Sequence, residues 1–142
     1  LTNIIIDLEP ITLYLITLEP RHLFFHTIIG ATLIAILCAI FGKRWCELAI
    51  DIWNDEVKGN LEAKWFSGQN KISNTAALSG GVIGAWSHLL LDSFMHDDIT
   101  PLSPFTESNH LLGKISISHL HFICVGFGVI GLILIMIRKL RT

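Results

Sequence analysis

The segment GAWSHLLLDSFMHDDITPLSPF, from Gly84 to Phe105, joins an apolar helical stretch to a dense group of ionisable side chains. His88 and Asp92 are four residues apart, a spacing that places both side chains on one face of a helix, one turn apart. Ionisable groups are costly inside a membrane, and where they occur they are usually functional. The segment therefore predicts a helix that carries a polar site into an apolar protein.

The residues before His88 predict how this helix packs. Small side chains allow transmembrane helices to approach closely, and the segment carries Gly80, Gly81, Gly84 and Ala85. On a 3.6-residue period, the helix face that contains Gly81 continues to His88 and Asp92. We therefore expect residues 74–95 to form an interior helix, with a site buried between helices near its end.

The composition is that of one apolar unit. Of the 142 residues, 51% are hydrophobic and 15% are charged, so we expect a single membrane-embedded domain over residues 1–142. A net charge of -2 without a basic face argues against nucleic-acid binding. Three dispersed cysteines imply neither a disulfide framework nor a zinc knuckle. The chain opens at Leu1 on what looks like the second half of a helix, so we expect the native protein to start further upstream.

Two stretches have the composition of transmembrane helices. Residues 23–41 and 115–137 are apolar apart from histidines, and they are long enough to cross ~30 Å of hydrocarbon. Near the N-terminus, Pro10 follows two acidic residues. We therefore expect a transmembrane helix that ends near Asp7, followed by a short re-entrant or interfacial piece. Residues 45–57 predict an amphipathic helix on the membrane surface. The expected fold class is all-α, an integral membrane bundle of about four helices.

The distribution of lysine and arginine predicts the orientation of the bundle. Eight of the ten lie in residues 43–71 or after residue 137, and the other two are Arg21 and Lys114. The eight are Lys43, Arg44, Lys58, Lys64, Lys71, Arg138, Lys139 and Arg141. Cytoplasmic loops of membrane proteins are enriched in these residues, so the connection 10–22 and the loop 96–114 are expected to face outward.

Three segments deliver metal-ligating side chains to the same predicted depth. A His pair four residues apart opens one helix, a His and Asp pair with the same spacing ends another, and an Asp-x-Glu element ends the first. Imidazole and carboxylate are ligands of zinc, manganese and iron, and zinc is the default for a mixed set. We therefore predict one or two divalent ions, with zinc as the first choice. The predicted ligands are Asp7, His22, His26, His88, Asp92 and His96. Glu9 and Asp98 are predicted as acid or base groups, or as carboxylates that orient a ligand imidazole.

Each candidate also has a simpler interpretation. Ionisable residues near helix ends often only mark the membrane interface, where they reach water at little cost. Whether His96, Asp97 and Asp98 are ligands or interface residues therefore stays open. For the deeper residues, the alternative to a metal site is polar packing within the bundle.

The motifs NIIIDLEP (3–10), RHLFFHTIIGA (21–31) and the Gly84–Phe105 segment resemble those of the YdjM-like family of inner-membrane proteins, described as membrane-bound metal-dependent hydrolases. The resemblance covers roughly residues 3–131. The family's Asp-x-Glu element is matched by Asp7 and Glu9, and its His-x3-His-[Thr/Ser] element by His22, His26 and Thr27. Its Ser-His-x3-Asp and Met-His-x-Asp elements are matched by Ser87, His88, Asp92, Met95, His96 and Asp98. A His-containing element that usually precedes the Asp-x-Glu has no match here.

The resemblance implies a metal-dependent hydrolase of the bacterial inner membrane, with its site facing outward. The site's position favours a lipid or another membrane-associated ester or phosphoester as the substrate. A metal or proton transporter or sensor is an alternative, but a relay needs polar residues toward the cytoplasmic side, and residues 33–41 and 122–137 carry none that ionises except cysteine. A non-catalytic membrane protein with a structural metal is a further alternative. The sequence does not indicate an oligomeric state.

Overall fold

The computed structural model describes residues 1–19, 21–58 and 67–140, and all the regular structure within these ranges is helical. This confirms the predicted all-α class. The chain forms α1 (Thr2–Thr17), α2 (Ile28–Leu37), α3 (Lys43–Val57), α4 (Asn74–Met95) and α5 (Ile117–Leu140). A 3₁₀ turn, η1 (Phe24–His26), precedes α2, and a π-helical turn, η2 (Cys38–Gly42), joins α2 to α3. Since Ile28–Val57 is one continuous helix of 30 residues, the described bundle has four helices.

The first helix does not end near Asp7, so that prediction was wrong. α1 continues through Pro10 to Thr17, and no separate re-entrant piece follows Asp7. Proline removes one backbone hydrogen bond from a helix, and it can kink the helix without ending it. The helix ends at Leu18, whose φ of 61° is left-handed and whose N–H donates to the Tyr14 carbonyl. Asp7 and Glu9 therefore lie in mid-helix, close to the buried ring of Pro10.

The predicted helix over 23–41 begins five residues later than expected. Thr27 is the N-cap of α2, because its hydroxyl oxygen accepts the Gly30 N–H at 3.0 Å. Residues 24–26 form the η1 turn, which folds back on the start of α2. A Cβ on Gly30 would lie 1.9 Å from the Phe24 carbonyl oxygen, so this approach requires glycine. His22 and His26 are consequently not on one face of a helix.

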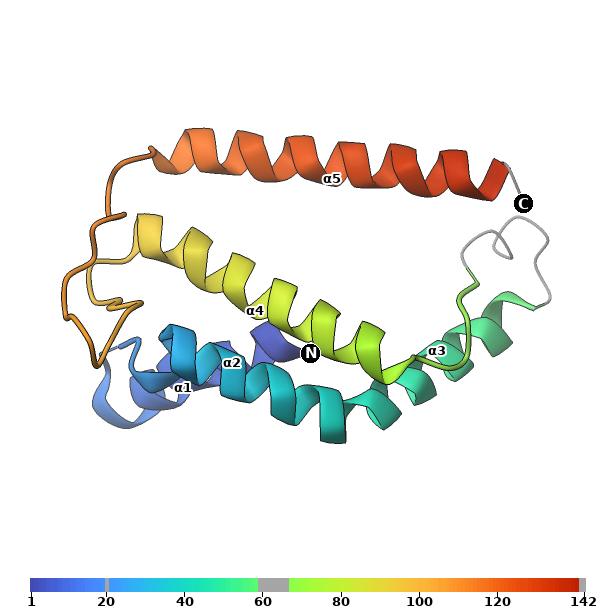
Figure 1. Cartoon of the computed structure of the whole chain (residues 1–142), viewed down its shortest axis with the longest axis horizontal. Helices are drawn as coiled ribbons and strands as arrows, with labels where there is room; N and C mark the ends of the chain where they lie inside the picture. Colours follow the sequence, from blue (N-terminus) through green and yellow to red (C-terminus); the bar gives the residue numbers. More distant parts are fainter. Residues whose placement is uncertain (20, 59–66, 141–142) are drawn as a thin grey trace.

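The amphipathic helix predicted over 45–57 is present as α3, and it leaves the line of α2 at the π turn (Figure 1). Glu47 and Asn54 are buried under the following segment: Glu47 accepts the Ile72 N–H, and Asn54 bonds to Gly68 and Asn70. The exposed large side chains of α3 are Trp45, Leu48, Ile52 and Trp53. The helix therefore turns its apolar face away from the protein, and its position on a membrane surface stays a prediction.

α4 is the centre of the bundle and has the predicted bounds. A Cβ on Gly81 would lie 3.2 Å from the Ala35 carbonyl oxygen of α2, and Ala85 is fully buried. No heavy atom lies within 4 Å of a Cβ added to Gly80, so the close contact runs along the helix face of Gly81 and Ala85. The core consists of Ile6, Ala31, Ile34, Ala35, Ala85, Leu89 and Ile99. This packing leads directly to His88 and Asp92, one and two turns further along the same helix.

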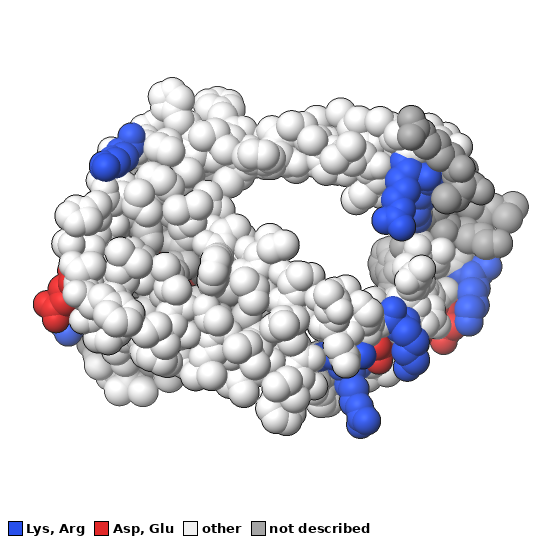
Figure 2. All heavy atoms as spheres, viewed as in Figure 1, with Lys and Arg blue, Asp and Glu red and all other residues white. Residues whose placement is uncertain are grey.

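α5 stands apart from the other helices. It starts two residues later than predicted, and Leu120 is its one buried residue. An opening separates most of α5 from the rest of the protein (Figures 1 and 2). A helix that is apolar all round is typical of a buried or membrane-spanning helix. Ile28–Val57 and Ile117–Leu140 are both long and apolar enough to cross a membrane.

Basic side chains are concentrated at one end of the molecule, where α3 and the end of α5 lie (Figure 2). α3 starts with Lys43 and Arg44, and the last turn of α5 holds Arg138 and Lys139. Lys64 and Arg141, which contribute to the predicted asymmetry, are outside the described residues. At the opposite end, the Ile28 N–H donates to the Pro101 carbonyl at 2.9 Å, which joins the 96–114 loop to the start of α2.

Replacement of Gly30 by alanine tests the close approach of η1 to α2. We expect Gly30→Ala to destabilise the protein by about 1–3 kcal/mol, since the added methyl group must displace the Phe24 backbone. The measurement is thermal unfolding of the purified protein in detergent. Gly80→Ala is the matched control, because no heavy atom lies within 4 Å of its added Cβ and alanine favours a helix. Equal midpoints for the two variants would contradict the predicted strain at Gly30.

Candidate metal centre

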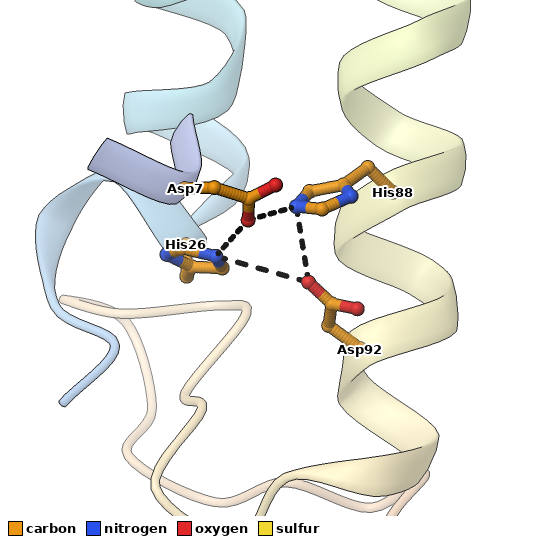
Figure 3. Close-up of side chains that lie close together, drawn as sticks. All are labelled: Asp7, His26, His88 and Asp92. Atoms are coloured by element: carbon orange, nitrogen blue, oxygen red, sulfur yellow. Dashed lines mark hydrogen bonds and ion pairs between the residues drawn. The ribbon is translucent and has the colours of Figure 1, made fainter. Parts of the chain in front are cut away.

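Four side chains from three elements converge between α1 and α4 to form the buried cluster, which consists of Asp7, His26, His88 and Asp92 (Figure 3). His88 Nε2 lies 3.0 Å from Asp7 Oδ1 and 3.1 Å from Asp92 Oδ2. His26 Nε2 lies 3.9 Å from Asp7 Oδ1 and 3.7 Å from Asp92 Oδ2. Two nitrogen and two oxygen atoms thus alternate around a ring.

The spacing in the buried cluster fits a metal ion. With metal bonds of about 2.0–2.2 Å, two ligands of a tetrahedral ion are roughly 3.3–3.6 Å apart. In the ring, the two distances from His88 are slightly shorter than this range, and the two from His26 are slightly longer. His26 is fully buried, and its Nε2 atom faces the two carboxylates without a hydrogen bond. A buried polar atom without a partner is costly, so this nitrogen supports an ion at the centre of the ring.

Glu9 determines how His26 faces the cluster. Its Oε2 atom lies 3.3 Å from His26 Nδ1, and its carboxylate accepts the backbone N–H groups of Leu23 at 2.9 Å and Phe25 at 3.1 Å. A hydrogen bond on Nδ1 fixes the tautomer whose Nε2 is free to bind a metal. Of the two roles predicted for Glu9, acid or base group and carboxylate that orients a ligand imidazole, this contact with His26 corresponds to the second.

A second group, the exposed cluster, lies beside the first and consists of His22, His96 and Asp98. Asp98 Oδ2 accepts the His22 backbone N–H at 2.8 Å, and both of its oxygen atoms lie 3.0 Å from His22 Nδ1. The His22 and His96 rings are 4.5 Å apart between centroids. The His22 and His26 rings, which belong to different clusters, are 4.4 Å apart. The two clusters are therefore adjacent.

The arrangement of the two clusters shifts the pKa values of His26 and Asp98. Burial lowers the pKa of the His26 imidazole below its ordinary value of 6.5, and His22 lowers it further, whereas Glu9 and Asp92 act in the opposite direction. Burial raises the pKa of Asp98, but the hydrogen bonds from His22 outweigh it and hold that pKa below its ordinary value. A neutral imidazole and an ionised carboxylate are the forms that bind metals, so both shifts favour binding near neutral pH.

The structure brings all eight predicted site residues to one end of the bundle, but in an arrangement that the sequence did not predict. His22 and His26 were expected as a pair of ligands for one ion, and they fall into different clusters. Asp97 joins neither cluster. Sequence reasoning missed the roles of Thr27 and Gly30 in shaping the turn that carries His26, although a Thr cap before an apolar helix is a recognisable signal.

Over the described residues, the fold and the site define an all-helical protein with two candidate membrane spans and a His and Asp cluster able to hold a metal ion. No family model, curated protein or solved structure matches the chain. The resemblance to the YdjM-like proteins therefore stays a prediction.

The role of Glu9 can be tested by metal affinity. We expect Glu9→Gln to weaken zinc binding by about 10–100-fold, because the amide cannot accept all three hydrogen bonds that hold the turn and His26. The measurement is competitive titration against a chelating dye in detergent. Glu56→Gln is the control, since Glu56 is exposed on α3, at the end of the molecule away from both clusters. Equal affinities for both variants would show that Glu9 does not support the metal site.

Proposed function

We propose that this protein is a membrane-bound metal-dependent hydrolase that acts on a lipid or another membrane-associated ester or phosphoester. The observation that carries the proposal is the buried His26 Nε2 atom, which lacks a hydrogen-bond partner and faces two carboxylates at the spacing of shared metal ligands. Asp7, His26, His88 and Asp92 hold the ion, and zinc is favoured by their mixed donor set. A divalent ion there supplies Lewis-acid chemistry, which polarises an ester or phosphoryl oxygen and lowers the pKa of water.

The chain's own residues shape this site in distinct ways. Asp92 is nearly buried, and the Asp7 side chain is 44% exposed, so the buried cluster is reached from the Asp7 side. Glu9 holds the imidazole of His26 in the tautomer that binds a metal. The exposed cluster adjoins the buried cluster, because the His22 ring contacts the His26 ring.

The location of the site supports a membrane-associated substrate. α5 presents a continuous apolar surface, and two helices are candidates for membrane spans. Most of the described lysine and arginine residues lie at the opposite end from the clusters (Figure 2). By the positive-inside tendency, this supports a site on the outward side of a membrane, and the resemblance to YdjM-like proteins favours the bacterial inner membrane.

Hydrolysis can be assayed with the full chain in detergent micelles that contain phospholipids or acyl esters, by release of phosphate, phosphorylated headgroup or fatty acid. We expect zinc-dependent turnover that a chelator abolishes and added zinc restores. His88→Ala and Asp92→Asn should lower kcat by at least about 100-fold, since an ion in this role supplies several kcal/mol of transition-state stabilisation. His119→Ala is the control, because His119 bonds locally to Ser116 outside both clusters. Loss of the metal in His88→Ala without loss of turnover would contradict the proposal.

A structural metal is the second candidate function, and a specific observation favours it. Four protein donors in the buried cluster correspond to the closed coordination of structural zinc, whereas catalytic zinc usually has three and an open position. Such an ion would join α1, η1 and α4. It predicts that chelation lowers the unfolding midpoint while no hydrolysis occurs with any of the substrates above.

A further inference from the structure

We propose that the exposed cluster of His22, His96 and Asp98 is a second divalent-cation site, and that its open coordination position receives the substrate oxygen. The inference deepens the proposed function, on which its second half rests, because it adds to the ion of the buried cluster a second ion whose open coordination position meets the substrate. The binding of the second ion is testable on its own.

The donors of the exposed cluster are suited to zinc. One ring nitrogen from each histidine and one oxygen of Asp98 lie within 4.8 Å of one another. His22 Nδ1 is hydrogen-bonded to the Asp98 oxygen atoms at 3.0 Å, so a cation that binds both groups replaces this bond and separates the atoms to roughly 3.3–3.6 Å. The backbone N–H of His22 also holds Asp98 Oδ2, so the carboxylate is positioned before any cation arrives. Two imidazoles and a carboxylate are a donor set that binds zinc in catalytic sites.

The count of donors distinguishes the two clusters. The buried cluster offers four protein ligands, and the exposed cluster offers three, which leaves a coordination position for water or substrate. A cavity of about 660 Å³ opens over this position, and its lining includes all three members of the exposed cluster. Arg21 lies in the same lining, where its guanidinium pairs with the Glu19 carboxylate at 2.7 Å, so an anionic group of a phosphoester would have to displace Glu19 to reach it.

The adjacency of the clusters gives the second ion a place in the same reaction. The imidazoles of His22 and His26 meet edge to face, with ring centroids 4.4 Å apart. An ion with an open coordination position can bind a phosphoryl oxygen and stabilise the charge that develops on it. The substrate class that suits this arrangement is a phosphoester whose apolar part stays in the membrane and whose phosphoryl group enters the cavity.

Metal stoichiometry measured by mass spectrometry tests the assignment. The full chain is purified in detergent, stripped with a chelator and reloaded with zinc. We expect about two equivalents in the wild type and in Asp97→Asn, a carboxylate control from the same cavity, and about one in His96→Gln and in His88→Gln. Cobalt substitution provides a second measurement on the wild type alone, since a four-donor ion and an open ion give different visible spectra.

The outcomes separate this inference from the proposed function. Suppose that the wild type binds one equivalent, which is lost in His88→Gln and kept in His96→Gln. This result overturns the second site and leaves the buried site intact. If the single equivalent is instead lost in His96→Gln and kept in His88→Gln, the result supports the second site and contradicts the buried one. Two equivalents in His96→Gln overturn the inference, and so does a cobalt spectrum of the wild type that shows only the four-donor environment.

Discussion

Glu9 makes the interaction on which the site depends, because one carboxylate of α1 binds three groups of a segment 14 to 17 residues later in the chain. Two of these groups are backbone N–H donors of the turn before α2, which no helical hydrogen bond can satisfy. The third is the imidazole of His26. The Glu9 carboxylate therefore satisfies the N–H groups of the turn and joins α1 to the start of α2. It also directs a nitrogen that can bind a metal toward α4.

Close packing of α4 against α2 places the other two members of the buried cluster, His88 and Asp92. α4 approaches α2 along Gly81 and Ala85, where a larger side chain would meet the Ala35 backbone. His88 and Asp92 continue this face, so they point toward α1 and the turn at the level where the backbone contact ends. A structure with looser packing here would separate the nitrogen and oxygen donors beyond the reach of one ion.

The helices were predictable from the sequence where hydrophobic periodicity and length dominate, and this holds for α4, α5 and the amphipathic α3. The predictions failed where a local constraint overrode the pattern. Pro10 suggested a helix end, but the loss of one hydrogen bond did not stop α1. The four-residue spacing of His22 and His26 suggested a helical pair, but Thr27 caps α2 after both of them. The residue types at the site were thus predictable, and their grouping was not, because it depends on where a helix starts.

Electrostatics explains why the two clusters should differ in affinity. The buried cluster combines two carboxylates with two imidazoles, so with neutral imidazoles it carries two negative charges, one on the 13% exposed side chain of Asp92 and one on the 44% exposed side chain of Asp7. Burial of such charge without a partner is costly, and a divalent cation neutralises it. The exposed cluster has one carboxylate, already hydrogen-bonded to His22, and its charge is partly solvated. The larger negative charge and the fourth donor therefore favour tighter cation binding in the buried cluster than in the exposed cluster.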